Sequence, residues 1–142
     1  MIKMYPLRFD PSCRKIRSTD PVPWVNLYFL VCPKLVRAVG DLESAGWIRA
    51  YEKRLEAEET LMAEFEADHE AYAVERWGLL TAADKAYAAK KRFEKTLRGT
   101  GVCGMTYRRK IKCLHAQYAY HLAREGGTVV GRWVDEQLLA ES

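Results

Sequence analysis

The sequence predicts a mainly α fold, a small helical domain in which one long helix packs on shorter helices and an N-terminal extended or short β segment covers one end. Three observations favour this class. Apolar residues recur at helical spacing over most of the chain after residue 32. Proline and glycine stand where helices are expected to start and end. With 142 residues and 49% hydrophobic content, the chain can bury a core as a single domain, residues 1–142.

The first 31 residues are expected to form a loop with an extended segment, ahead of a helical body over residues 32–142. Four prolines stand within the first 23 residues, where they disfavour helix. Residues 24–31 read Trp-Val-Asn-Leu-Tyr-Phe-Leu-Val, and this density of aromatic and β-branched side chains is typical of a short strand. Residues 4–9 are the candidate partner of that strand.

The helical body is expected to begin at Pro33, because a proline at the first helical position loses no hydrogen bond, and Gly46 marks the end of this first helix. A long helix is then predicted from Trp47 to about Gly78. Its apolar stripe is interrupted only at Glu58, so we expect the helix to pack antiparallel against a neighbour. The stripe consists of Ile48, Tyr51, Leu55, Met62, Phe65, His69 and Tyr72.

Three further segments complete the predicted body. Thr81 followed by Asp84 resembles a capping box and predicts a helix over residues 82–97. Residues 99–104 contain three glycines and predict a flexible loop, in which Cys103 is expected to be a mobile, exposed thiol. A helix is expected over residues 113–125, closed by Gly126 and Gly127, and a short terminal helix over residues 133–140.

Composition limits the class of protein. No apolar run approaches the roughly 18–20 residues that span a bilayer, and the N-terminus has no signal-peptide pattern, so we expect a cytoplasmic protein with no membrane partner. In a reducing compartment the four cysteines are expected to be free thiols and not two disulfides. They are therefore core residues, metal ligands or reactive thiols.

Charge is distributed unevenly along the chain. Residues 41–76 carry eleven acidic and four basic side chains, whereas residues 85–112 carry ten basic and one acidic side chain. The favoured interpretation is two oppositely charged helices that lie near each other, each with a solvated face. The alternative is a basic surface for an anionic ligand or a protein partner, with nucleic acid less favoured because no nucleic-acid-binding motif is present. The candidate anion-binding residues are Arg108, Arg109, Lys110 and Lys112.

Two cysteines stand where helices are expected to begin. Cys32 precedes Pro33, and Cys113 precedes an apolar stretch that contains His115. The unpaired N–H groups of a helix start favour a thiolate over a thiol. Side chains two residues apart in a helix point about 200° apart. Cys113 and His115 can therefore share one ion only if Cys113 lies at or before the helix start.

Several strings resemble the bacterial family called domain of unknown function 501. They are Cys-Pro-Lys-Leu-Val-Arg-Ala-Val within residues 27–46, His-Glu-Ala-Tyr at residues 69–72 and Lys-Cys-Leu-His-Ala at residues 112–116. The resemblance extends from about residue 13 to residue 133, and Cys13 occupies the position of an N-terminal cysteine of that family. The chain departs from the family pattern at Tyr120, where a histidine is frequent, and at Cys103, which the pattern does not contain.

The resemblance favours a metal site made of Cys13, Cys32, Cys113 and His115 over the alternative in which the cysteines are buried hydrophobic residues. Three sulfurs and one nitrogen suit tetrahedral zinc, and three cysteines with a fourth ligand also suit an iron–sulfur cluster. Such a site would tie the N-terminal segment to two helix starts. His69 is the replacement ligand if His115 points away, and Cys103 is the third choice.

Three classes of function are compatible with these residues. The first is a metal-binding protein whose basic surface binds an anion or a protein partner. The second is an enzyme that uses the same metal centre on a phosphate-bearing or nucleotide-like substrate, and the third is a metal-free helical interaction module. Thiol catalysis, with Cys113 as nucleophile and His69 or His115 as base, is the least favoured because no third, orienting residue is evident.

Overall fold

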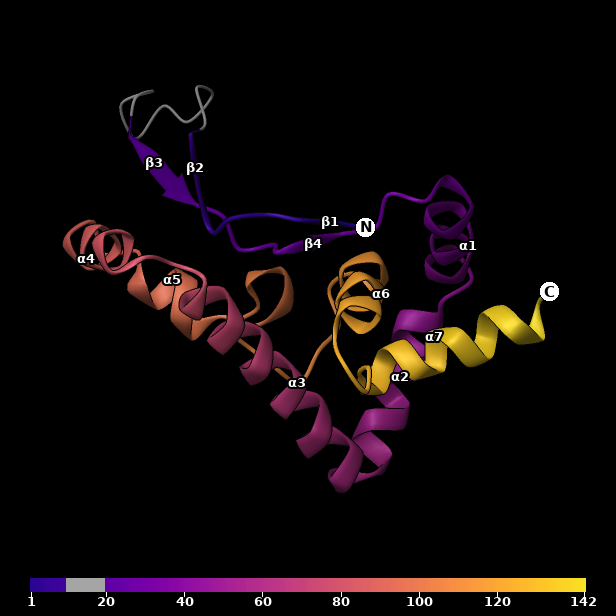
Figure 1. The fold of residues 1–142 in the computed structure, drawn as a ribbon. Coiled ribbons are helices and arrows are strands. Elements are labelled where there is room, and N and C mark those ends of the chain that lie inside the picture. Colours follow the sequence, from indigo (N-terminus) through magenta and orange to yellow (C-terminus); the bar gives the residue numbers. More distant parts are fainter. Residues whose placement is uncertain (10–19) are drawn as a thin grey trace.

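The computed structural model describes residues 1–9 and 20–142, and it confirms the mainly α fold with short strands at the N-terminus (Figure 1). None of the described helices is long and apolar enough to cross a bilayer. The described elements are β1 (Ile2–Lys3), β2 (Leu7–Phe9), β3 (Pro21–Pro23), β4 (Tyr28–Phe29), α1 (Pro33–Ser44), α2 (Trp47–Ala57), α3 (Glu59–Gly78), α4 (Ala82–Lys90), α5 (Glu94–Gly99), the 3-10 turn η1 (Val102–Gly104), α6 (Leu114–Ala123) and α7 (Val129–Ala140).

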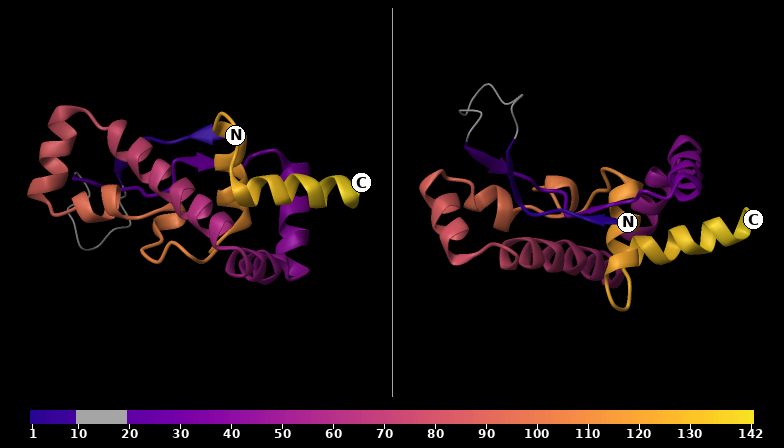
Figure 2. Two further views of the ribbon diagram at one scale, coloured as in Figure 1. Left: turned by 90° about the horizontal axis from the view of Figure 1, so that it is seen from below. Right: turned by 45° about the horizontal axis from the view of Figure 1, so that its top comes forward.

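The N-terminal segment forms two separate two-stranded antiparallel sheets. β1 pairs with β4, with Ile2 opposite Phe29, and β2 pairs with β3. The strand predicted at residues 24–31 is thus shortened to β4. Its partner is β1 and not the predicted segment, residues 4–9. Tyr28 of β4 stacks on Tyr120 of α6 with 6.0 Å between ring centroids. Tyr28 therefore packs this segment onto α6, and β4 lies beside α6 in the views of Figures 1 and 2.

The long helix predicted over residues 47–78 is in fact two helices, of which α3 is the longest of the described elements. Glu58 has an extended backbone (φ −133°, ψ 105°) and separates α2 from α3, and the two helices form the V at the bottom of Figure 1. The helix is therefore interrupted at Glu58, the same residue that interrupts the apolar stripe. The bend lets Tyr51 and Leu55 of α2 and Met62 and Phe65 of α3 enter one buried cluster, which a straight helix of this length would spread apart.

The helix predicted over residues 82–97 is also divided. Thr81 caps α4 as predicted and accepts a hydrogen bond from the Asp84 N–H at 3.1 Å. α4 then ends in a Schellman-type turn, in which Arg92 adopts φ 62° and the Phe93 N–H donates to the Ala88 carbonyl at 2.7 Å. This turn redirects the chain so that α5 packs along α3.

The segment after α5 is anchored by polar groups of α3. His69 accepts a hydrogen bond on Nδ1 from the Val102 N–H at 2.9 Å. Within η1, Cys103 adopts φ 60° and is half-buried, so the expectation of an exposed thiol is wrong. Arg76 is fully buried, and its guanidinium donates to the five carbonyl oxygens of Val25, Thr96, Leu97, Thr100 and Gly101.

The main core lies where α1, α2, α3, α6 and α7 meet. Val39 and Leu42 of α1 and Leu114 of α6 are completely buried in it, so α1 is held against the start of α6. α7 begins four residues earlier than predicted, because Thr128 caps it by accepting a hydrogen bond from the Gly131 N–H. The core therefore fixes the relative position of the two helices that carry the candidate site.

Candidate metal centre

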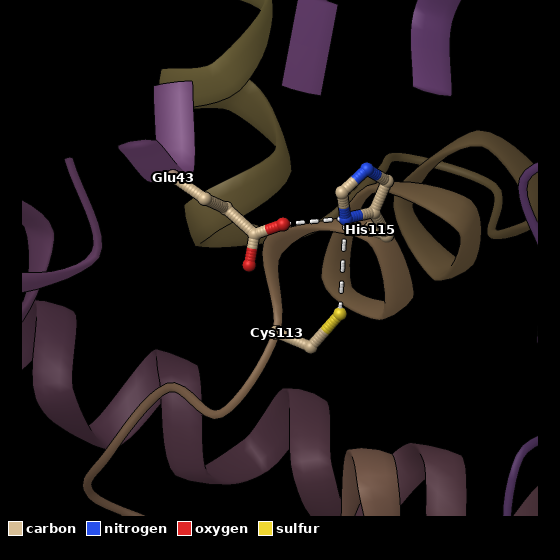
Figure 3. A group of neighbouring side chains, drawn as sticks. All are labelled: Glu43, Cys113 and His115. Atoms are coloured by element: carbon tan, nitrogen blue, oxygen red, sulfur yellow. Dashed lines mark hydrogen bonds and ion pairs between the residues drawn. The ribbon is translucent and has the colours of Figure 1, made fainter. Parts of the chain in front are cut away.

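α1 and α6 bring three metal-ligating side chains together. Glu43 stands in the last turn of α1, Cys113 immediately precedes α6, and His115 lies in the first turn of α6. One ligand atom from each residue lies within 4.8 Å of the other two, and Figure 3 shows the side chains pointing toward one another. Because Glu43 is remote from the other two in sequence, the packing of α1 on α6 creates this group.

Cys113 can converge with His115 because it lies outside the helix. It is the N-cap of α6 and has an extended backbone (φ −151°, ψ 123°). Its Sγ lies 4.0 Å from Nδ1 of His115. Cys113 thus lies before the start of the helix, which is the condition under which Cys113 and His115 can share one ion.

Both ring nitrogens of His115 have partners. Nε2 lies 2.9 Å from the carbonyl oxygen of Val36 in α1, and Nδ1 lies 2.5 Å from Oε1 of Glu43. A carbonyl can only accept, so the Val36 oxygen places a proton on Nε2. Nδ1 is thereby the nitrogen available to a metal, and a histidine oriented by a backbone carbonyl in this way is common among protein metal ligands.

The neighbours of the site shift its pKa values. The adjacent Cys103 thiol has the largest effect on Cys113, and together with an N–H of the helix start and His115 it lowers the pKa of Cys113 to about 5 despite burial. The same thiol contact, with burial, raises the pKa of Cys103. Burial opposes protonation of His115, but a backbone carbonyl and the Glu43 carboxylate outweigh it and raise the pKa of His115. Cys113 is therefore the thiol of this pair that ionises first.

A cavity of about 340 Å³ opens beside the group. Cys103, Cys113 and His115 form one part of its wall, so a ligand in the cavity would reach the sulfur and the imidazole directly. The rest of the lining consists of Asn26, Tyr28, Phe29, Leu30, Val36 and Ala116. No Lys, Arg, Asp or Glu occurs among these described lining residues.

Two of the four predicted ligands, Cys113 and His115, come together in the structure. Cys32 is the N-cap of α1 as expected, and two backbone N–H groups of that helix start lower its pKa, but its side chain is exposed and lies outside the group of three. Cys13 lies outside the described residues. Among the residues that are described, Glu43 is the third member, and a ligand role for Cys13 and Cys32 stays a prediction.

Glu43 is not predicted from the sequence, because a single carboxylate on a helix is most often a solvated side chain. Gly40 stands one turn before Glu43, but a Cβ built on it would make an ordinary contact 3.8 Å from the His115 ring, so this glycine is not required by the packing and does not mark the site.

His69, the replacement ligand of the sequence analysis, is a core residue. It is completely buried, its ring lies 4.6 Å from that of Phe65, and burial lowers its pKa to about 4. It does not belong to the ligand group found among the described residues. Since His115 points into the site, no replacement is needed.

The predicted anion-binding residues contact acidic helices. Arg108, Arg109 and Lys110 form ion pairs with carboxylates of α2 and α3, and Lys112 is exposed and does not line the cavity. Opposite charges thus lie side by side as predicted, but these basic residues belong to the non-helical segment between η1 and α6 and not to a helix. The pairs are Arg108 with Glu70, Arg109 with Glu59 and Glu66, and Lys110 with Glu56, at 2.5 to 3.2 Å.

Comparison with known proteins identifies one family. Its model, described as protein of unknown function (DUF501), matches residues 2–136 of the chain. No curated protein and no solved structure matches the chain. The matched range contains Glu43, Cys113 and His115 together with every described residue that lines the cavity.

Proposed function

We propose that this chain, which belongs to the DUF501 family, binds a divalent metal ion through Glu43, Cys113 and His115. The observation that carries the proposal is the convergence of one oxygen, one sulfur and one nitrogen donor within 4.8 Å of one another. The metal would join the end of α1 to the start of α6. It would thereby stabilise the packing of two helices, whereas the sequence analysis expected it to tie down the N-terminal segment.

The protonation of the group supports a divalent ion. Nδ1 of His115 lies 2.5 Å from Oε1 of Glu43, a distance suited to a proton held between them, and the Glu43 carboxylate helps to raise the pKa of His115. With that proton removed and Cys113 ionised, a carboxylate, a thiolate and a neutral imidazole carry a charge of −2. A divalent cation neutralises this charge, and its binding would release protons.

The donor set favours zinc over an iron–sulfur cluster. Zinc is routinely bound by mixed sulfur, nitrogen and carboxylate ligands in tetrahedral geometry. Iron–sulfur clusters are held mainly by several cysteine thiolates, and only one thiolate belongs to the group that the described residues form. Zinc is therefore the proposed cofactor.

The cavity supports a second candidate function at the same centre, an enzyme. Three protein ligands leave the fourth position of a tetrahedral zinc free, which is typical of catalytic sites. When bound, such a metal can activate water or polarise a carbonyl group. The phosphate-bearing substrate expected for an enzyme is less suited to this cavity, because no basic side chain occurs among its described lining residues.

The proposal is tested by elemental analysis of the full chain, purified anaerobically, loaded with Zn²⁺ and dialysed. We expect about one equivalent of zinc in the wild-type protein and a large loss in Cys113→Ser, Glu43→Gln and His115→Gln. Retention of less than about a tenth of an equivalent in the wild-type protein would overturn the proposal.

The matched control is Cys32→Ser, because Cys32 and Cys113 are both cysteines at the N-cap of a helix. We expect this variant to keep its zinc. If Cys32→Ser lost as much zinc as Cys113→Ser, the ligand set would include Cys32, as the sequence analysis expected, and the assignment to Glu43, Cys113 and His115 alone would be wrong.

A further inference from the structure

The cavity beside the proposed metal centre is lined mainly by apolar side chains. Tyr28, Phe29 and Leu30 of the β4 region form one wall, Val36 of α1 another and Ala116 of α6 a third. Its volume of about 340 Å³ lies at the lower end of the range of ligand pockets, roughly 300–1,000 Å³. An apolar cavity of this size beside an open coordination position offers a ligand two different anchors.

We infer that the cavity binds a small molecule with an uncharged, apolar body, aromatic or branched aliphatic, and one group that ligates the metal. This inference rests on the proposed function and adds the class of ligand to it. The body of the molecule would lie against the apolar walls. Its head group would take the coordination position next to Cys113 and His115.

Electrostatics exclude the more highly charged ligands. The proposed centre is neutral overall, because the divalent cation is matched by the Glu43 carboxylate and the Cys113 thiolate. No Lys or Arg occurs among the described residues of the cavity wall, and a metal-bound His115 is neutral. Burial of a phosphate dianion there would leave its charge without a partner, which is costly. A neutral or singly charged head group avoids this cost.

Asn26 provides a neutral polar contact in the wall. It lines the cavity, and its Oδ1 is buried without a hydrogen-bond partner within the described protein. An unsatisfied buried acceptor is unfavourable. A ligand that carries an N–H or O–H donor between its body and its head group would satisfy this oxygen, after a small movement of the side chain.

Two hydroxamates test the inference, because they share an N–H-bearing head that binds a metal as a singly charged anion, and they differ only in the body. Benzohydroxamate carries a phenyl group and acetohydroxamate a methyl group. Each is titrated into the full chain loaded with Co²⁺, and binding is followed by the visible spectrum of the cobalt ion. We expect benzohydroxamate to bind about tenfold more tightly or better, through burial of the larger apolar surface. Inorganic phosphate is expected to leave the spectrum unchanged.

A variant that fills the cavity tests whether the preference for benzohydroxamate arises there. Ala116→Phe is expected to retain cobalt and to lose the preference for benzohydroxamate, whereas Leu139→Phe, at an exposed position of α7 away from the cavity, is expected to keep it. Equal affinities of the wild-type protein for the two hydroxamates, tight binding of phosphate, or an unaffected preference in Ala116→Phe would overturn the inference while the proposed metal site stands. Failure of the wild-type chain to load any metal would overturn both.

Discussion

His115 donates a hydrogen bond from Nε2 to the carbonyl oxygen of Val36 at 2.9 Å, and this bond decides which nitrogen faces the site. Glu43 Oε1 and Cys113 Sγ then both approach the same nitrogen, Nδ1. In a thiol or serine triad, the nucleophile and the orienting acid contact opposite nitrogens of the histidine. The observed geometry is therefore better suited to three ligands around one ion than to a nucleophile activated by His115.

Zinc is expected to stabilise the fold through Glu43. A ligand that binds only the folded state at 100 times its Kd adds about 2.7 kcal/mol to the free energy of unfolding. We expect added Zn²⁺ to raise the Tm of the wild-type protein and to have little effect on Glu43→Gln, as measured by thermal unfolding. Asp41→Asn, which changes an exposed carboxylate of the same helix, is the control and should respond like the wild type. An equal rise in Glu43→Gln would remove Glu43 from the ligand set.

His69 is expected to make stability depend on pH. Burial lowers its pKa from 6.5 to about 4 in the folded protein. Between these values the unfolded chain binds a proton that the folded chain does not, so stability is complete above pH 6.5 and falls as the pH drops toward 4. Between pH 7.5 and pH 5 we expect His69 to lower the free energy of unfolding by roughly 2 kcal/mol.

The measurement is the free energy of unfolding in urea at both pH values, for the wild type and for His69→Asn. Asparagine keeps an acceptor for the Val102 N–H and does not titrate in this range. We expect the variant to be less stable at pH 7.5 and to lose less stability on acidification. An identical loss in both proteins would show that His69 is not buried in its neutral form.

Arg76 is expected to be a major determinant of stability. Replacement by methionine would preserve much of the buried volume but would remove the guanidinium donor from five carbonyl oxygens, of which only those of Thr96 and Gly101 keep another donor among the described residues. We expect a loss of about 3–5 kcal/mol in the free energy of unfolding, measured by urea denaturation. Arg132→Met is the control, since Arg132 forms an exposed pair with Glu64 and its loss should cost less than about 1 kcal/mol. Similar losses in the two variants would contradict the role of Arg76.

Gly101 is expected to tolerate no side chain. A Cβ at this position would lie 2.2 Å from Nδ1 of His69, whereas a Cβ at Gly78 would meet no atom within 4 Å. We expect Gly101→Ala to destabilise the protein by about 2 kcal/mol or more, and Gly78→Ala to be neutral or slightly stabilising. Chemical denaturation of both variants checks the difference, and a neutral Gly101→Ala would show that His69 can move away from the loop.

Local sequence signals located most helix termini. Pro33 starts α1, Thr81 caps α4, and Gly126 and Gly127 follow the end of α6, as predicted. These features could be predicted because each depends on the residue itself and its nearest neighbours, through φ restriction, side-chain capping or tolerance of positive φ. The position of Cys113 at the start of its helix likewise depends on nearby residues only.

The breaks within helices were harder to predict. Glu58 and Arg92 are ordinary helix-forming residue types, and neither carries the signature of a terminus. The chain leaves the helix at these positions because two segments with separate apolar faces must both reach the core. The interrupted stripe at Glu58 contained this information, but its meaning depended on where the remaining helices lie.

The helical class, the helix starts at Cys32 and Cys113, and the condition under which Cys113 and His115 can converge all follow from backbone geometry over a few residues and could be predicted. The packed fold adds that Glu43 joins them, that Cys103 lies against Cys113 in a cavity wall, and that Cys32 lies outside the group. These contacts depend on tertiary packing because helix packing selects the partners of a helix-start cysteine. Burial of Val39, Leu42 and Leu114 in one core presses α1 against α6 and carries Glu43 to the site.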